Sequence, residues 1–260
     1  GIIPLAGKKL PDTPMAVSCL NLALGMKGQL ADRMFHYRQR GKEGLFMSFV
    51  NDFTIPLVAA EPYYYLGMVN TAQQLVFEAM EAIPDYQKSV RCFKRLAETN
   101  LITGRYEVAG KYLRILQHTL FYKDWATEML ACLDDEARID AHPEYGRLRK
   151  LTPQTDLFFN PAEPEMTLSL LLQANPENRM AYEYLMGITL LKKDMGRFVH
   201  YYPLGEKLGY RSIPKSYQEA LLFGWSMQKH TPGEEIPWKI NRETGERLRE
   251  YARIYTSTRS

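Results

Sequence analysis

The sequence has few cysteines and no long apolar run. Cysteine occupies only three of the 260 positions, 19, 92 and 132, and the spacings fit no zinc or redox motif. An odd number of widely spaced cysteines argues against a scaffold built on disulfides and favours buried free thiols. No run of about 18 apolar residues occurs, so the sequence as given is predicted not to span a membrane.

Motifs of known catalytic chemistry are also missing. The five histidines include no pair three or four residues apart, and no glycine-rich phosphate loop or G-x-S-x-G motif occurs. Cys132 and His118 would form a nucleophile pair only if the fold joined them, and a structural cysteine is the favoured interpretation. We therefore predict no catalytic residue, no metal ligand and no cofactor. The net charge of +3 is too small to indicate binding of nucleic acid.

What the sequence does contain is helical periodicity, seen most clearly between residues 85 and 120. Two apolar stripes repeat there at the 3.6-residue period of an amphipathic helix. The first stripe consists of Val90, Phe93, Leu96 and Ala97, and the second of Tyr106, Ala109, Tyr112, Leu113, Leu116 and Leu120. Gly104 lies between them and can end a helix in the left-handed conformation. The pattern predicts an antiparallel helix pair, which needs similar neighbours to cover its remaining apolar faces.

The rest of the chain predicts such neighbours and no strand. We expect an entry arm at residues 1–13 and one helical-repeat domain at 14–260, with subunits at about 14–84, 85–151 and 165–260. Residues 152–164 carry three prolines and are predicted to be a loop. Thr13 and Pro14 are typical of a helix start, and residues 30–40 are expected to form the return helix of the first pair. Residues 121–137 are predicted to be one further helix. The fold class is therefore all-α.

Two alternatives stay open where Pro56 and Pro62 interrupt the pattern, because proline in a helix interior removes a hydrogen bond. One alternative places a helix near residues 53–66, bent at Pro62, and a second helix at about 68–83. The other begins a single long helix at Pro62.

Small residues repeat along this region with a fixed displacement. Gly67, Ala72, Ala79 and Pro84 are spaced by 5, 7 and 5 residues, and Gly104 and Ala109 follow Gly67 and Ala72 by 37. This pattern resembles the tetratricopeptide repeat. A second unit resembles it from Asn175-Pro176 onward, with Pro176 as the first helical residue and with Gly196 near the turn position. The resemblance implies a right-handed α-solenoid of antiparallel helix pairs with degenerate repeats.

The amino-acid sequence of three segments, residues 82–113, 175–194 and 201–222, resembles that of a narrower group of proteins. It is similar to the soluble C-terminal region of an uncharacterised family of bacterial membrane proteins. The resemblance implies that the chain is tethered to a membrane through a region preceding it, on an unspecified side. It brings no activity and no site residues.

Tyrosine and charged residues supply the candidate binding surface. The tetratricopeptide resemblance places six side chains toward a concave groove: Glu61, Tyr64, Tyr65, Arg91, Lys94 and Glu98. The simpler interpretation is that the tyrosines pack between repeats. We predict a non-catalytic interaction module that binds a protein or peptide segment through tyrosine packing and through arginine and lysine pairs with carboxylates. The alternative is a glycan- or small-molecule-binding accessory domain of a membrane-embedded enzyme, which a closed pocket would favour.

Overall fold

The structure is a computed structural model that describes residues 1–50, 52–155, 157–227 and 234–257. Within these ranges it contains fifteen α-helices and no strand apart from an isolated bridge between Arg40 and Lys42. The all-α prediction is confirmed. The helices are α1 (Ile2–Lys8), α2 (Pro14–Met26), α3 (Leu30–Arg33), α4 (Ile55–Leu66), α5 (Val69–Glu81), α6 (Val90–Ile102), α7 (Tyr106–Leu116), α8 (Lys123–Leu130), α9 (Glu136–Ala141), α10 (Tyr145–Leu151), α11 (Pro164–Ala174), α12 (Arg179–Leu191), α13 (Met195–Tyr201), α14 (Lys215–Ser226) and α15 (Arg242–Ser257). Three 3-10 segments accompany them, η1 (Met34–His36), η2 (Pro84–Tyr86) and η3 (Tyr202–Leu208).

Several helix boundaries follow directly from local sequence. The side chain of Thr13 accepts a hydrogen bond from the Ala16 amide at 3.2 Å and caps α2, as predicted. The first alternative for the proline-interrupted region is correct, because α4 contains Pro62 and ends at Gly67, and a separate helix α5 follows. The single long helix beginning at Pro62 is therefore wrong.

The predicted helix pair is confirmed, and it has a counterpart 37 residues earlier. The pairs α4/α5 and α6/α7 pack together, and each turns at a left-handed glycine, with φ of 92° at Gly67 and 72° at Gly104. Ala72 and Ala109, which follow these glycines by five residues, are both fully buried. A small residue at this position lets the two helices of a pair approach closely.

Other boundaries differ from the predictions. The return helix expected at residues 30–40 stops after Arg33 and η1, and among described residues 37–50 and 52–54 no further helix occurs. Residues 121–137 form α8 and the start of α9 rather than one helix. The segment expected as an entry arm contains the short helix α1.

The start of α12 shows why one boundary was misplaced. Asn178, and not Pro176, begins this helix: its side-chain oxygen accepts from the Ala181 amide at 3.1 Å, and its amide group donates to the Leu66 carbonyl at 2.9 Å. A tertiary contact therefore selects the cap. Gly196 lies inside α13, and the left-handed residue of this turn is Lys193, with φ of 58°.

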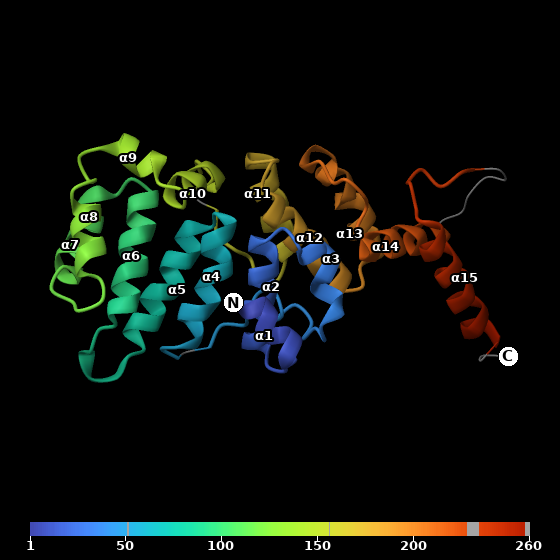
Figure 1. Cartoon of the computed structure of the whole chain (residues 1–260), viewed down its shortest axis with the longest axis horizontal. Helices are drawn as coiled ribbons and strands as arrows, with labels where there is room; N and C mark the ends of the chain where they lie inside the picture. The colour runs from blue at the N-terminus through green and yellow to red at the C-terminus, as the bar shows by residue number, and fades with distance from the viewer. Residues whose placement is uncertain (51, 156, 228–233, 258–260) are drawn as a thin grey trace.

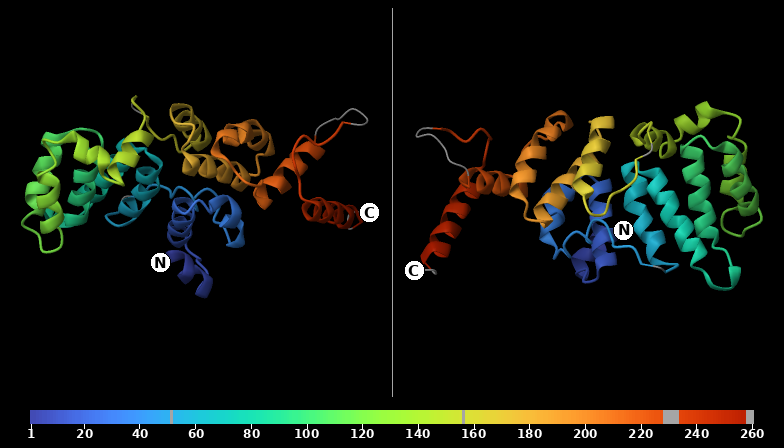
Figure 2. Two further views of the ribbon diagram at one scale, coloured as in Figure 1. Left: turned by 45° about the horizontal axis from the view of Figure 1, so that its top comes forward. Right: turned by 180° about the vertical axis from the view of Figure 1, so that it is seen from behind.

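The helices form a row that does not follow chain order (Figure 1). The N-terminal helix α2 lies in the middle, with α4 on one side and α12 on the other. From α4 the chain runs outward through α5, α6, α7 and α8 and returns along one edge through α9 and α10, which packs on α4 and α6. Helices α11 to α15 then form the opposite arm. Helices α2 and α3 with the turn between them, called here the N-terminal hairpin, project from the row in Figure 2. In a repeat array each unit contacts its sequence neighbours, whereas here the first helices join two arms.

The joint between the arms is polar as well as apolar. The Leu30 amide donates to Glu183 at 3.2 Å, and the Ser216 hydroxyl donates to the Ala31 carbonyl at 3.0 Å. The Arg179 guanidinium donates to the Gly28 carbonyl at 3.3 Å. One buried apolar cluster extends through this joint from α4 to α14. The N-terminal hairpin is therefore the element that connects the two halves of the row.

Candidate functional site

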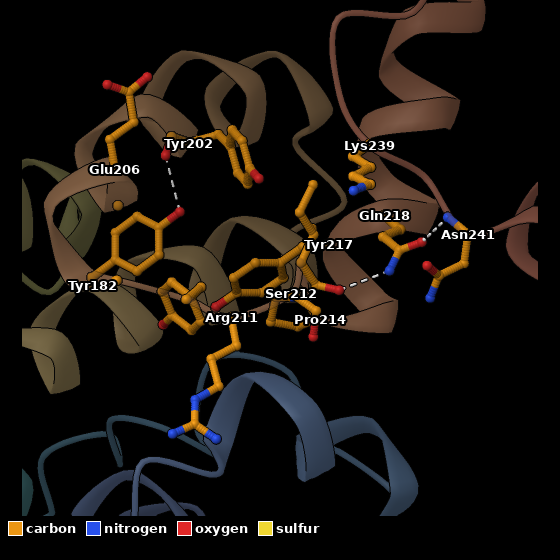
Figure 3. A pocket seen from close by; sticks show the side chains of 14 residues that line it. Tyr182, Tyr202, Glu206, Arg211, Ser212, Pro214, Tyr217, Gln218, Lys239 and Asn241 are labelled. Carbon is orange, nitrogen blue, oxygen red and sulfur yellow. Dashed lines mark hydrogen bonds between the residues drawn. The ribbon is translucent and has the colours of Figure 1, made fainter.

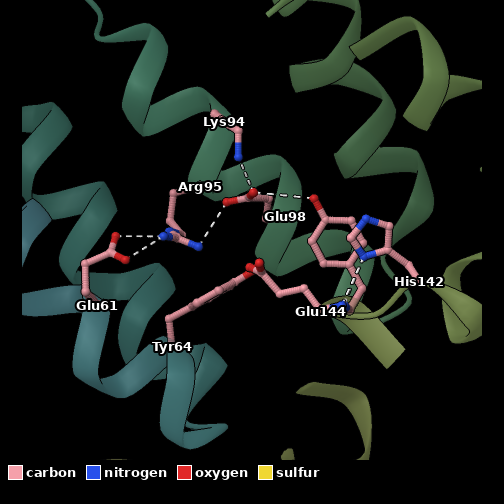
Figure 4. Close-up of polar contacts among 8 residues, drawn as sticks. Glu61, Tyr64, Lys94, Arg95, Glu98, His142 and Glu144 are labelled. Atoms are coloured by element: carbon pink, nitrogen blue, oxygen red, sulfur yellow. Dashed lines mark hydrogen bonds and ion pairs between the residues drawn. The ribbon is translucent and has the colours of Figure 1, made fainter. Parts of the chain in front are cut away.

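The residues predicted to form the binding surface gather around a side chain that the sequence analysis did not select, Arg95 (Figure 4). One nitrogen of Arg95, Nη2, donates to both carboxylate oxygens of Glu61 at 2.7 Å. The other, Nη1, lies 3.0 Å from an oxygen of Glu98. Glu61 and Glu98 are 37 residues apart and occupy equivalent positions in α4 and α6. One arginine therefore forms ion pairs with the equivalent glutamates of two neighbouring helix pairs.

Tyr64 forms the base of this network. Its ring lies 3.7 Å beneath the Arg95 guanidinium, and its hydroxyl donates to Glu144 at 2.9 Å. Burial raises the pKa of Tyr64, and the charge of Glu98 raises it further, so the phenol stays neutral. Burial lowers the pKa of Arg95, but Glu98 and Glu61 outweigh that effect and hold it above the ordinary value.

Glu98 is the most enclosed charged member of the network, with only 4% of its surface exposed. It pairs with Lys94 one helical turn earlier and accepts a hydrogen bond from the Tyr145 hydroxyl at 3.4 Å. Lys94 in turn lies 4.7 Å from the centre of the Trp125 ring. The network thus links α4, α6, α8 and α10, and its carboxylates are matched by cations and hydroxyls inside the chain.

The prediction that these side chains are free for a partner is wrong for Tyr64 and Glu98, because both are buried and bonded within the chain. Glu61 and Lys94 are also engaged in ion pairs. Arg91 is exposed and Tyr65 is half-buried, so their role in binding stays a prediction. The repeat spacing matched Glu61 with Glu98, but it gave no signal that Arg95 lies between them.

Two glutamates in the C-terminal arm, Glu165 on α11 and Glu183 on α12, are completely buried. Glu165 lies 2.7 Å from the Lys192 ammonium and 3.6 Å from Arg197. Glu183 accepts from Arg179 at 2.8 Å and from the Tyr210 hydroxyl at 3.1 Å. Removing Arg179 would leave Glu183 without a cation, and removing Lys192 would leave Glu165 with only the more distant Arg197, so these clusters are structural.

Two hollows remain as candidate ligand sites. The first, called here the apolar groove, lies between residues 46–50 and the helices α4 and α5, and has a volume of about 280 Å³. Phe46, Tyr63 and Phe159 form an aromatic cluster along it, with ring centres 4.6–5.1 Å apart. Phe49 stands at its mouth with 59% of its surface exposed.

The second hollow, called here the tyrosine pocket, has a volume of about 480 Å³ and lies between α12, η3 and α14 (Figure 3). Tyr182, Tyr202, Tyr210 and Tyr217 line it, together with Lys239 and Asn241 from the segment before α15. This volume suits a small molecule. The sequence analysis missed the pocket, because its residues come from segments that only the tertiary fold brings together.

The model of a family of unknown function, DUF6057, matches residues 1–260.

The chain belongs to the DUF6057 family. The expectation of an uncharacterised family is therefore confirmed. No curated protein and no solved structure matches the chain.

In the described part of this DUF6057 chain, no three His, Cys, Asp or Glu side chains are grouped so that they could hold a metal ion. The same ranges contain no helix with the length and apolarity needed to cross a membrane. All three cysteines are free thiols, and Cys92 and Cys132 are buried as expected, whereas Cys19 is only half-buried. Burial raises the pKa of Cys19 and of Cys92, which opposes thiolate reactivity at neutral pH.

Glu183 gives the DUF6057 chain a specific pH dependence. Burial raises the pKa of Glu183 above its ordinary value of 4.5, and the Arg179 pair and the Tyr210 hydroxyl oppose that rise. Between the two pKa values, Glu183 is protonated in the folded chain and ionised in the unfolded chain. Its contribution to stability is therefore fully present below pH 4.5 and is lost as the pH rises through the folded pKa. Urea titrations of the parent and of Glu183→Gln measure this contribution as the difference between their free energies of unfolding. We expect that difference, parent minus variant, to fall as the pH rises across this window. A difference that rises with pH would contradict the assignment.

Proposed function

We propose that this chain is a non-catalytic interaction module that binds an extended segment of another protein in the apolar groove. The supporting observation is the pairing of a rigid aromatic floor with an exposed aromatic residue at the mouth. Phe46 touches both Tyr63 and Phe159, and Phe49 beside them is largely exposed to water. An occupant that covers Phe49 would bury apolar surface that the free chain leaves in water.

The chemistry of the groove defines the segment that fits it. Helix α4 forms an apolar wall, whereas α5 contributes mainly polar side chains, so the groove suits a peptide that has apolar side chains on one face. The α4 lining consists of Ile55, Pro56, Ala59 and Tyr63, and the α5 lining of Thr71, Gln74, Leu75 and Glu78. Glu78 lies on the wall and, together with Glu81, forms a shallow acidic hollow next to Phe49. The proposed ligand is therefore an extended apolar peptide with a lysine or arginine at the end nearest Phe49.

The scaffold in this proposal is a tetratricopeptide-like array of helix pairs. Its support is the 37-residue correspondence between the turn residues Gly67 and Gly104 and between Glu61 and Glu98. Tethering to a bacterial membrane belongs to the same proposal and rests on the sequence resemblance alone. A helical-repeat scaffold offers a long fixed surface without moving parts.

Phe49→Asp is expected to weaken binding of a groove-directed peptide at least about tenfold, because a charge replaces the aromatic surface that the peptide covers at the mouth of the groove. Peptides are selected on the parent chain from a displayed random library, synthesised with a fluorophore and titrated by fluorescence anisotropy. The selected sequences are expected to combine apolar residues with a lysine or arginine.

Phe121→Asp is the matched control, because Phe121 is 83% exposed in the loop after α7 and far from the groove in sequence. It is expected to leave peptide affinity unchanged. Equal affinities of the parent and the Phe49→Asp chain, or equal losses in the two variants, would refute the groove as the binding site.

A further inference from the structure

We infer that one edge of the molecule lies on the surface of an anionic lipid membrane, with the helix α1 and the loop between α7 and α8 as its two contact points. The loop, at residues 117–122, is called here the α7–α8 loop. Both segments combine exposed apolar side chains with neighbouring cations and lack acidic residues. The contact lies in the membrane interface and crosses no bilayer. It requires neither the apolar groove nor a tether, so it does not rest on the proposed function.

The α7–α8 loop exposes two consecutive apolar side chains. Leu120 and Phe121 are 88% and 83% exposed, more than any other large apolar side chain of the described ranges. They belong to the turn that joins the end of α7 to the start of α8. Because apolar side chains transfer favourably from water into an apolar medium, two neighbours that lie almost fully in water mark a contact site.

Charges of one sign surround this loop. Between Glu107 and Asp124 the chain carries three exposed cations, Lys111, Arg114 and Lys123, and no acidic residue. None of the three forms an ion pair with a described residue. Lys111 and Arg114 follow each other along α7, about 4.5 Å apart along the helix axis, and Lys123 begins α8 on the other side of the loop. Apolar side chains in front of cations match the layering of an anionic bilayer, whose acyl chains lie beneath phosphate groups.

Helix α1 repeats this composition at the other contact point. It packs on α2 and leaves Leu5 64% exposed, and Leu10, just beyond its end, is 70% exposed. Lys8 and Lys9 lie between these two side chains and are both exposed, and residues 1–11 contain no acidic residue. Two segments far apart in the sequence therefore present the same chemistry.

The two contact points share one edge of the molecule. Figure 1 and the left view of Figure 2 both show the α7–α8 loop and α1 at the lower edge, although the loop lies at the outer end of one arm and α1 in the middle of the row. The described segments between them on this edge, 47–50, 52–54 and 84–89, add two acidic residues and one lysine to the five cations above, so the edge keeps a positive charge. A flat bilayer contacts both points at once, whereas a peptide would have to span the arm.

The first test measures co-sedimentation of the whole chain with vesicles of phosphatidylcholine, with and without phosphatidylglycerol. The anionic vesicles are expected to bind at least about tenfold more tightly, because each lysine or arginine near an anionic surface adds a favourable electrostatic contribution. High salt is expected to reduce this preference, since it screens the charges. No binding to the anionic vesicles, the result expected if this edge serves a protein partner, overturns the inference, and so does equal binding to both kinds of vesicle.

Variants of the exposed apolar side chains locate the first contact point. Leu120→Ser combined with Phe121→Ser is expected to weaken binding to anionic vesicles at least about tenfold without lowering the melting temperature, because both side chains are exposed in the free chain. The matched control is Phe223→Ser combined with Met227→Ser, an exposed apolar pair at the end of α14, and it is expected to leave binding unchanged. Equal losses in the two double variants, or no loss in the first, would contradict the assignment of the α7–α8 loop.

The second contact point is tested by charge reversal. Lys8→Glu combined with Lys9→Glu is expected to weaken binding to anionic vesicles at least about fivefold, because it places two negative charges against the lipid phosphates. Lys207→Glu combined with Lys239→Glu changes the net charge equally at two exposed lysines of the other arm and is the matched control. A loss in the α1 variant no larger than in this control would overturn the contact through α1.

Insertion of the α7–α8 loop is measured with Phe121→Trp and lipids brominated on their acyl chains, which quench tryptophan on contact. The vesicle-bound variant is expected to be quenched more strongly than the bound parent, because its added indole ring enters the acyl-chain boundary. Equal quenching of variant and parent would show that the loop stays outside the lipid and would overturn the inference. None of these measurements uses the groove-directed peptide, so they succeed or fail independently of the apolar groove.

Discussion

Arg95→Met is expected to lower the free energy of unfolding by about 3–5 kcal/mol, the usual effect of removing one partner from a buried ion pair. The Arg95 side chain is 12% exposed and contacts Glu61, Glu98 and the Tyr64 ring together. Without it, the buried Glu98 retains Lys94 as its cation, and Glu61 loses the pair that joins α4 to α6. Urea denaturation followed by far-ultraviolet circular dichroism measures the change.

Arg91→Met is the matched control, because Arg91 lies one turn earlier on α6 and is exposed. It is expected to change stability by no more than about 0.5 kcal/mol. Adding Glu61→Gln and Glu98→Gln to Arg95→Met is expected to restore part of the loss, since the buried charges leave with their cation. A loss in Arg95→Met as small as in Arg91→Met would show that the network does not hold the helix pairs together.

Gly67→Ala is expected to lower the free energy of unfolding by about 2–5 kcal/mol. Two effects add: a left-handed backbone costs about 1–2 kcal/mol with a Cβ atom, and overpacking costs about 1–3 kcal/mol. Gly67 has φ of +92°, and a Cβ there would lie 2.8 Å from the Leu151 carbonyl oxygen at the end of α10. Backbone atoms cannot move aside as a flexible side chain can. Chemical denaturation of the purified variant measures the loss.

Gly104→Ala separates the two effects, because Gly104 is the equivalent turn residue 37 positions later. Its φ is +72°, and an added Cβ would meet nothing within 4 Å. This variant is expected to lose only the backbone cost of about 1–2 kcal/mol. Equal losses in the two variants would mean that α10 does not pack on the α4–α5 turn as the structure describes.

Helix identity was predictable because its signals are local. The stripes of α6 and α7, the cap at Thr13 and the glycine turns all depend on residues within a few positions of one another. The order of helices in the row was not predictable, because it depends on contacts such as Leu30 with Glu183. The Asn178 cap was missed for the same reason, since its amide is satisfied by the distant Leu66 carbonyl.

The candidate sites divide in the same way. The repeat spacing correctly grouped Glu61 and Glu98, but it could not show that Arg95 lies between them and consumes both carboxylates. Tyr182 and Tyr217 have the helical spacing of core residues, and their burial agrees with that pattern. What the spacing could not show is a hollow left between them and the segment at residues 239–241. A cavity depends on how side chains from distant segments pack together, whereas sequence periodicity indicates only which residues of one helix are buried.

The central position of the N-terminal hairpin has a consequence for synthesis on the ribosome. The Leu30 amide donates to Glu183, which is synthesised 153 residues later, so this hydrogen bond cannot form until that part of α12 has been made. Helices α4 to α8 pack on their chain neighbours and can fold while translation continues. Helices α2 and α3 lack their contacts with α12, and α3 also lacks those with α14, until these later helices emerge. Helices α2 and α3 are therefore synthesised before α4 to α14 and are nevertheless among the last of these helices to be fully packed. During that interval their apolar surface is a natural substrate for chaperones.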